Sequence, residues 1–267
     1  MTTEAKIQLI SSEIGTLWMT YMISSARLIY FDVFRIKTID KEAQNILGSY
    51  ITELRDVQNK VVNIFNSEEV VIPIGFNEND KIKESPTLYD DFFHIRSLRE
   101  AMKLSLGRCA VYIATSYMKE ANDVFKLHLD ISNKYYMITT NYLLGKGVLP
   151  RTPYLTMPKQ VEFVEDKNYM SGLNLFSNKR SLNTIEVGLI NEAVEANIWS
   201  MQLLMGFAQV SKESEVKKYL IEGTELTKKI VSELSALLLQ SDIQPTSTWV
   251  GKVTDSLQPP FSEKLMM

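Results

Sequence analysis

Apolar positions recur at three- and four-residue steps over six long segments of this chain, a spacing that predicts amphipathic α-helices. We expect helices at about 11–37, 40–66, 86–112, 119–144, 184–210 and 214–240. The first is apolar nearly all round, through Trp18 and Met19 among others, so it should be deeply buried. The third should begin at Pro86, capped by Ser85.

Two stretches break the helical pattern. Residues 70–76 are β-branched and contain Pro and Gly, which predicts an extended connector. Residues 148–181 contain three prolines and predict a linker. Its apolar side chains suggest that it lies along the protein surface, with a mobile tether as the alternative; they are Tyr154, Val161, Phe163 and Phe176.

The chain repeats itself at an offset of 173 residues. The stretch 9–15 returns as 182–188. The same offset carries Leu47 onto Leu220, Phe76 onto Trp249 and Leu88 onto Phe261. The first copy has four helices, whereas the second has two and a tail, Ser262 to Met267, where a third helix should begin. The pattern therefore predicts an all-α protein: an up-down four-helix bundle at 1–147, a linker at 148–181, and a half-complete second copy, a helical hairpin, at 182–267.

Composition narrows the class of protein. Of 267 residues, 45% are hydrophobic and 23% are charged, which is typical of soluble globular proteins. The net charge of −3 shows no excess of basic residues of the kind that binds nucleic acid. We find no secretory signal and no apolar run long enough to span a membrane, so we expect a cytoplasmic protein. No glycine-rich phosphate loop occurs, and no cofactor is predicted.

Three segments carry a resemblance to a known family: residues 11–22, the Pro73-Ile74-Gly75-Phe76 turn, and the stretch from Val253 to Met267 with its Asp-Ser and Pro-Pro-Phe-Ser motifs. They resemble a bacterial domain-of-unknown-function family of Bacillus-type endospore formers. The resemblance implies tandem ferritin-like four-helix bundles, distantly similar to the spore-coat protein F family, and hence a possible spore association. Members of such a family continue for two more helices, so this chain is expected to be truncated at its C-terminus. The family implies no activity.

A ferritin-like bundle raises the question of a di-metal site. Such sites need two Glu-x-x-His pairs, and none occurs here; Glu53 and Glu225 are followed three residues later by Asp56 and Lys228. The pair most similar to Glu-x-x-His is Asp91 and His94, an acid and a histidine with the same three-residue spacing. It is either half a metal site or a helix-start acid beside a half-exposed histidine, and we favour the second interpretation.

Three other residues carry candidate chemistry. His128 falls on an apolar stripe, which favours a hydrogen-bonded core residue over a metal ligand. Glu192 also falls on an apolar stripe; it is either a surviving metal ligand or a side chain that faces solvent, and we favour solvent. Cys109 lies on a buried stripe, so a structural role is expected rather than a reactive thiol.

Two functions therefore remain open. The first is a non-catalytic structural or interaction protein with no catalytic residue. The second is a ferritin-like di-metal oxidoreductase or metal-storage protein that uses iron or manganese, and it depends on fold analogy alone. The two helices of the second copy carry too much apolar surface to remain exposed to water. We expect them to pack on the first bundle or to form a homo-oligomer with a second protomer.

Overall fold

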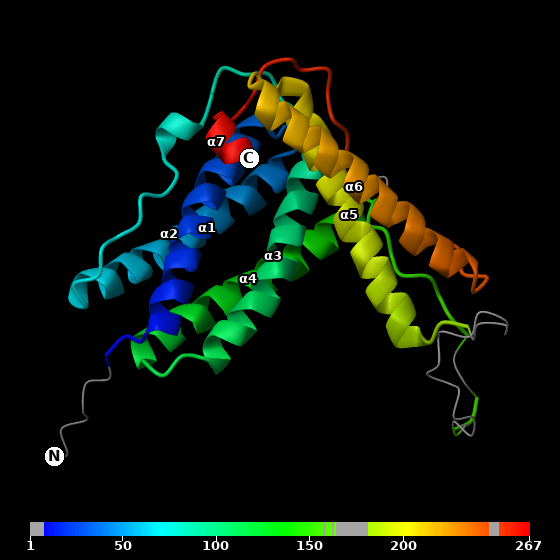
Figure 1. Cartoon of the computed structure of the whole chain (residues 1–267), viewed down its shortest axis with the longest axis horizontal. Coiled ribbons are helices and arrows are strands. Elements are labelled where there is room, and N and C mark those ends of the chain that lie inside the picture. The colour runs from blue at the N-terminus through cyan, green and yellow to red at the C-terminus, as the bar shows by residue number, and fades with distance from the viewer. Residues whose placement is uncertain (1–7, 157–158, 162, 164–180, 246–250) are drawn as a thin grey trace.

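The computed structural model describes residues 8–156, 159–161, 163, 181–245 and 251–267, and this part of the chain is all-α (Figure 1). The predicted fold class is confirmed. The elements in chain order are α1 (Ser11–Lys37), α2 (Lys41–Ser67), the 3-10 turn η1 (Glu78–Asp80), α3 (Asp91–Ala114), α4 (Lys119–Gly145), α5 (Thr184–Val210), α6 (Ser214–Leu239) and α7 (Glu263–Met266).

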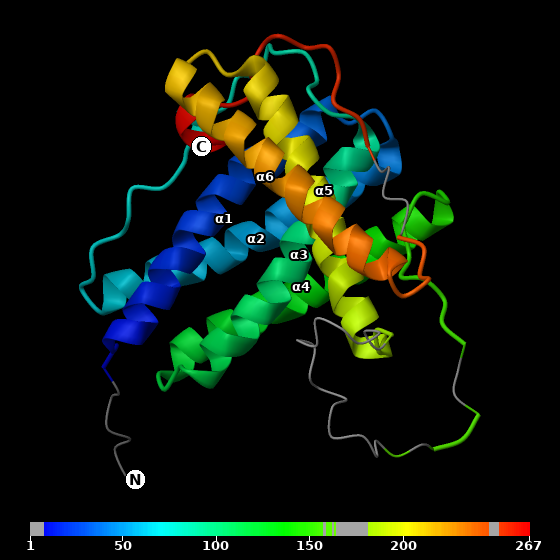
Figure 2. The same cartoon turned by 45° about the vertical axis from the view of Figure 1, so that its right-hand side comes forward.

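Helices α1 to α4, here called the N-terminal bundle, enclose the main core. Figures 1 and 2 show them as two hairpins, α1–α2 and α3–α4, and α2 packs along α4. The apolar side of α2 is fully enclosed, including Leu47, Leu54, Val57 and Val61. Full burial of such a side chain stabilises the fold by roughly 1.5–3 kcal/mol, so this seam contributes much of the cohesion of the bundle.

The expectation that α1 is buried all round is wrong. Trp18 is 43% exposed and Met19 is 48% exposed. Leu17, the adjacent residue, is fully buried. The bundle partners of α1 are α2 and α3, and the side of α1 that carries Trp18 and Met19 stays in contact with solvent.

The predicted start of α3 is also wrong. Asp90 is the residue that caps it, and its carboxylate accepts a hydrogen bond from the Phe93 amide at 2.9 Å. Ser85 instead forms a tight turn by donating to the Ile82 carbonyl at 2.9 Å. Pro86 lies in the connector before α3, because this stretch is held in an extended form by the C-terminal tail.

Residues 251–262 run antiparallel to residues 80–90 and pair with them across the top of the molecule (Figure 1). Isolated bridges join Lys81 to Phe261 and Tyr89 to Val253. The Phe261 ring stacks on Tyr30 of α1, with ring centres 5.0 Å apart. Two repeat-related connectors thus pair with each other, and the tail becomes part of the core.

The internal repeat appears in the helix boundaries. Ser11 and Lys41 begin α1 and α2, and Thr184 and Ser214, each 173 residues later, begin α5 and α6. The short helix α7 begins at Glu263, as the repeat predicts for the tail. Trp249, the predicted mate of Phe76, lies outside the described residues.

The predicted anchoring of the linker is wrong for its aromatic side chains. Tyr154 and Phe163 are 87% and 86% exposed, and Val161 is exposed as well. The contacts come instead from smaller neighbours: Thr152 accepts a hydrogen bond from Asn191, and Leu155 packs at the distal end of the α5–α6 hairpin. Phe176 lies outside the described residues.

Helix α3 lies at the centre of the molecule. Every residue from Phe93 to Met102 is buried, because α3 contacts the other N-terminal helices on one side and α5 on the other. The α5–α6 hairpin extends away from the bundle, with α6 on the outside (Figures 1 and 2). Among the described helices, none has both the length and the apolar character that a membrane span requires.

Candidate functional site

Asp91 and His94 lie together at the start of α3, where both hold the α1–α2 loop. The Asp91 carboxylate accepts hydrogen bonds from the Ile39 and Asp40 amides at 2.9 and 2.7 Å. His94 is 1% exposed, so the expectation of a half-exposed histidine is wrong. Its Nδ1 lies 2.9 Å from Thr38 Oγ1, and its ring stacks on Phe34.

The protonation state of His94 follows from this packing. The Thr38 hydroxyl already donates to the Phe34 carbonyl, so His94 Nδ1 must be the donor in its bond to Thr38. Burial lowers the pKa of His94 to about 3, which leaves a neutral imidazole at neutral pH. Both residues therefore serve as hydrogen-bonding anchors of a helix connection.

His128 lies elsewhere, in the interior of the N-terminal bundle on α4. It is 2% exposed. Burial, and then the positive charges of Arg27 and Arg108, lower its pKa to about 3. Two guanidinium groups beside a histidine oppose the approach of a metal cation rather than supply ligands for one.

Glu192 lies on α5, where its half-exposed carboxylate forms an ion pair with Lys103 of α3 at 2.6 Å. The four candidate ligands thus occupy three separate places. Within the described part of the chain, no three His, Cys, Asp or Glu side chains come together in a group that could hold a metal ion.

The largest concentration of buried charge lies between α3 and α5, and the sequence interpretation missed it. We call it the α3–α5 charge cluster; its members are Arg96, Arg99, Glu100, Lys103, Glu192 and Glu195. Glu195 is its centre. Its carboxylate contacts Arg99 at 2.8 Å and Lys103 at 3.1 Å, and its backbone carbonyl accepts from Arg96 at 2.8 Å.

The pKa values in this cluster show a balance between burial and pairing. Burial raises the pKa of Glu100, while Lys103 partly offsets that rise. Burial works to lower the pKa of Lys103, but Glu100 and Glu195 together raise it above its usual value. The cluster is stable as a set of charges only while its members remain together, since a buried charge without a partner costs several kcal/mol.

Neutral contacts extend the same seam. The Trp199 indole donates to Ser97 Oγ at 2.9 Å, and the Tyr89 hydroxyl donates to the Leu203 carbonyl at 2.7 Å. Gly206 allows this approach, because a Cβ atom at that position would collide with the Tyr89 ring. The α5–α6 hairpin is therefore joined to the bundle by directional polar contacts along α5.

The sequence does contain a pattern that is consistent with this contact between α3 and α5. Charges at 96, 99, 100 and 103 recur at helical spacing on α3, and those at 192 and 195 do so on α5. Such runs are typical of solvated faces as well. Spacing alone cannot distinguish two solvated faces from two faces that neutralise each other, because the pairing involves residues about 90 positions apart.

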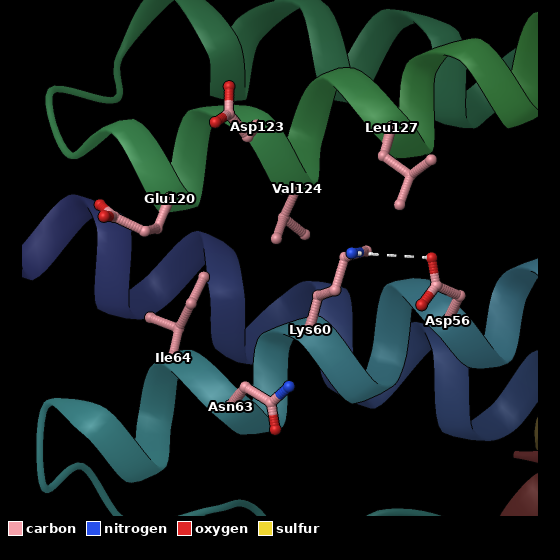
Figure 3. A pocket seen from close by; sticks show the side chains of 8 residues that line it. All are labelled: Asp56, Lys60, Asn63, Ile64, Glu120, Asp123, Val124 and Leu127. Carbon is pink, nitrogen blue, oxygen red and sulfur yellow. Dashed lines mark ion pairs between the residues drawn. The ribbon is translucent and has the colours of Figure 1, made fainter.

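A shallow groove runs between α2 and α4 (Figure 3). Its volume is about 510 Å³, and Asp56, Lys60, Glu120 and Asp123 contribute its charged lining. Lys60 and Asp56 face each other across one helical turn at 3.9 Å, both half-exposed or more. These groups project from an open surface, and the hydrogen bond from Lys119 lowers the pKa of the Asp123 carboxyl.

Cys109 is 1% exposed, in line with the structural role predicted for it. Burial raises the pKa of its thiol to about 11, although Arg108 and Arg27 favour the thiolate. The thiol is therefore protonated at neutral pH and is a poor nucleophile.

The outer helix α6 leaves large apolar side chains in solvent. Tyr219 and Leu226 are 60% and 59% exposed, and Leu237 is 39% exposed. The repeat mate of Leu237 is Ile64 of α2, which is buried in the N-terminal bundle. Positions that α4 helps to cover in the first repeat are therefore open in the second.

These features define an all-α helical-bundle protein in which a repeated helical hairpin is joined to a bundle by buried charges. The chain matches the family described as "protein of unknown function (DUF3231)" over residues 1–161 and 170–267. It therefore belongs to that family. No curated protein matches it.

Among solved structures, the chain is similar to one from Bacillus halodurans described as a "putative spore coat protein". The TM-score is 0.51 at 15% sequence identity, over 57% of this chain and 98% of that chain. At this identity the likeness concerns the fold alone.

Proposed function

We propose that this protein is a non-catalytic helical scaffold that assembles with a second copy of itself through the α5–α6 hairpin. The observation that carries the proposal is the apolar stripe of α6. Ile230, Leu234 and Leu237 occupy the repeat positions of Val57, Val61 and Ile64, which are buried in α2. Apolar side chains are retained on α6 although no helix of the described chain covers them fully.

The charges of α6 favour a second copy as the partner. Lys218 and Glu233 lie on opposite sides of Leu226, eight and seven residues away. An antiparallel pairing of two α6 helices about Leu226 brings Lys218 of one copy near Glu233 of the other at both ends. Two hairpins then form four helices, which is consistent with tandem ferritin-like units in which each second unit is completed by a partner.

The test is the oligomeric state in solution, measured by light scattering after size-exclusion chromatography. Wild-type protein is expected to be dimeric, and Leu226→Glu or Leu237→Glu is expected to be monomeric. Val111→Glu is the matched control, because Val111 is 60% exposed on α3, two turns beyond the last α3 residue of the α3–α5 charge cluster. A monomeric wild type, or equal dissociation by the control, contradicts the proposal.

The likeness to a spore coat protein supports a place in the outer layers of a spore. Fractionation of sporulating cells tests this, with the protein expected in coat extracts. The alternative function, a ferritin-like di-metal oxidoreductase or iron or manganese store, has less support, because the candidates Asp91, His94, His128 and Glu192 do not converge. Metal analysis of the purified protein decides between the two, since stoichiometric iron or manganese would favour the alternative.

A further inference from the structure

Two arginine side chains converge inside the N-terminal bundle. Arg27 of α1 donates to Ser105 Oγ of α3 at 2.6 Å and to the Ala101 carbonyl at 2.9 Å. Arg108, one turn further along α3, donates to the same Ser105 Oγ at 3.4 Å. One hydroxyl group, fully buried, therefore lies between two guanidinium groups.

Neither guanidinium group is neutralised. Arg35 and Arg99 each form an ion pair with a carboxylate. Among the described residues, no carboxylate lies within ion-pair distance of Arg27 or Arg108. Both side chains are partly buried, so their charges are less screened than those of surface arginines.

Two buried polar atoms beside the arginines have no hydrogen bond of good geometry. They are the Tyr50 hydroxyl of α2 and Nε2 of His128 of α4. Tyr50 is fully buried and His128 is 2% exposed. Orphaned polar atoms this deep in a protein are uncommon and call for an explanation such as a bound ligand.

Electrostatic effects place these groups in one neighbourhood. Burial raises the pKa of Tyr50, and the charge of Arg27, the approach of its side chain to the Tyr50 hydroxyl, and the charge of Arg108 oppose that rise. Burial lowers the pKa of Arg108, and the charge of Arg27 lowers it further. The two guanidinium groups thus repel each other, and an anion between them would convert this repulsion into attraction.

We propose that the N-terminal bundle binds a phosphate group between Arg27 and Arg108, with Ser105, Tyr50 and His128 as neutral hydrogen-bonding partners. A phosphate dianion matches the two unpaired positive charges. Its oxygens can accept hydrogen bonds from several directions, which suits groups that come from all four helices. A planar carboxylate carries half the charge and accepts bonds in one plane. The partly exposed arginines provide the route from solvent.

The probe is inorganic phosphate, titrated into the whole chain by calorimetry at constant ionic strength with chloride as the balancing ion. Wild-type protein is expected to bind it. Arg27→Gln and Arg108→Gln should each weaken binding by about 10- to 100-fold, the effect of losing one charge-assisted hydrogen bond. Arg55→Gln is the control, because Arg55 is exposed on α2 and the charge change is the same.

A second readout needs no variant. NMR titration of the two histidines should show that phosphate raises the pKa of His128 and leaves that of His94 unchanged, since His94 lies at the start of α3 beside the α1–α2 loop. Phenyl phosphate in place of inorganic phosphate distinguishes a phosphomonoester from the free ion as the ligand, and tighter binding of either one supports the site. Acetate should bind far more weakly.

Three results would overturn the proposal: no binding at millimolar phosphate, binding that Arg27→Gln and Arg108→Gln leave intact, or acetate binding as tight as that of phosphate. Arg108→Gln removes only one long hydrogen bond, so this variant is expected to fold, and circular dichroism checks that it does.

Discussion

Asp91 and Glu263 perform the same task in the two repeats. Asp91, the first residue of α3, accepts hydrogen bonds from the Ile39 and Asp40 amides in the α1–α2 loop. Glu263, the first residue of α7, accepts from the Lys212 amide at 2.6 Å in the α5–α6 loop. Lys212 is the repeat mate of Ile39. Each repeat therefore fixes its first interhelical loop with an acid at the start of its next helix.

This relationship predicts that Asp91 contributes to stability rather than to metal binding. Asp91→Ala should lower the free energy of unfolding by about 1–3 kcal/mol, because two amides lose a charged acceptor. Denaturant unfolding measures the change. Glu120→Ala is the control: Glu120 is an exposed acid in the first turn of α4, so its loss should cost at most about 0.5 kcal/mol. Equal effects of the two variants would contradict the loop-fixing role.

The α3–α5 charge cluster should be the part of the hairpin attachment most sensitive to substitution. Glu195→Ala leaves Arg99 and Lys103 without their central partner in a buried setting, so we expect a loss of about 3 kcal/mol. Denaturant unfolding measures the loss, and limited proteolysis should show faster cleavage in α5 and α6. Glu225→Ala is matched to it on the outside of α6, where the ion pair with Lys228 is exposed on both sides; a loss below about 1 kcal/mol is expected there.

Stability should fall as the pH falls below 6.5, because two histidines are buried in the neutral form. Each has a pKa of about 3 in the folded protein against 6.5 in the unfolded chain. The unfolded state binds more protons between these values, so each histidine removes up to about 1.4 kcal/mol of stability per pH unit in that window. Unfolding curves at several pH values between 7 and 4 measure the slope.

The variant that isolates this effect is His94→Gln, which removes one titrating group. Its loss of stability per pH unit between pH 6.5 and 4 should be smaller than that of the wild type, whatever its stability at pH 7. Parallel slopes would show that His94 is already charged in the folded protein. Above pH 7 the two proteins should show the same dependence on pH, because neither state then binds the proton.

Much of the fold could be predicted because its helices follow from the local spacing of apolar residues. The six long helices and the repeat follow from apolar spacing and from an offset that a single sequence reveals. The start of α3 could not be predicted from Ser85 and Pro86, which satisfy local capping rules. That stretch is extended because residues 251–262 pair with it, and no local pattern records a partner about 170 residues away.

The sequence identified the residues whose side chains could bind metal or react, but it did not identify the residues that these side chains contact. His94 looked half-exposed because its stripe gives no sign of the Thr38 and Phe34 contacts. Glu192 allowed two interpretations, a metal ligand or a side chain that faces solvent, because its partner Lys103 lies on another helix. The proximity of Arg27 and Arg108 could not be predicted from the sequence, because each resembles an ordinary surface charge. Only the packing of the helices brings both side chains to Ser105.

The contact between Gly206 and Tyr89 yields the last prediction. A Cβ atom at position 206 would collide with the Tyr89 ring, so Gly206→Ala must displace the ring or α5 and weaken the bond from the Tyr89 hydroxyl to Leu203. We expect a loss of about 1–3 kcal/mol in denaturant unfolding. Gly188→Ala, on the same helix with nothing within 4 Å of its added Cβ, should instead gain about 0.5–1 kcal/mol from helix propensity. Opposite signs for one substitution at two positions of α5 would locate the close approach of the hairpin to the bundle at Gly206; a gain at both would place that approach elsewhere.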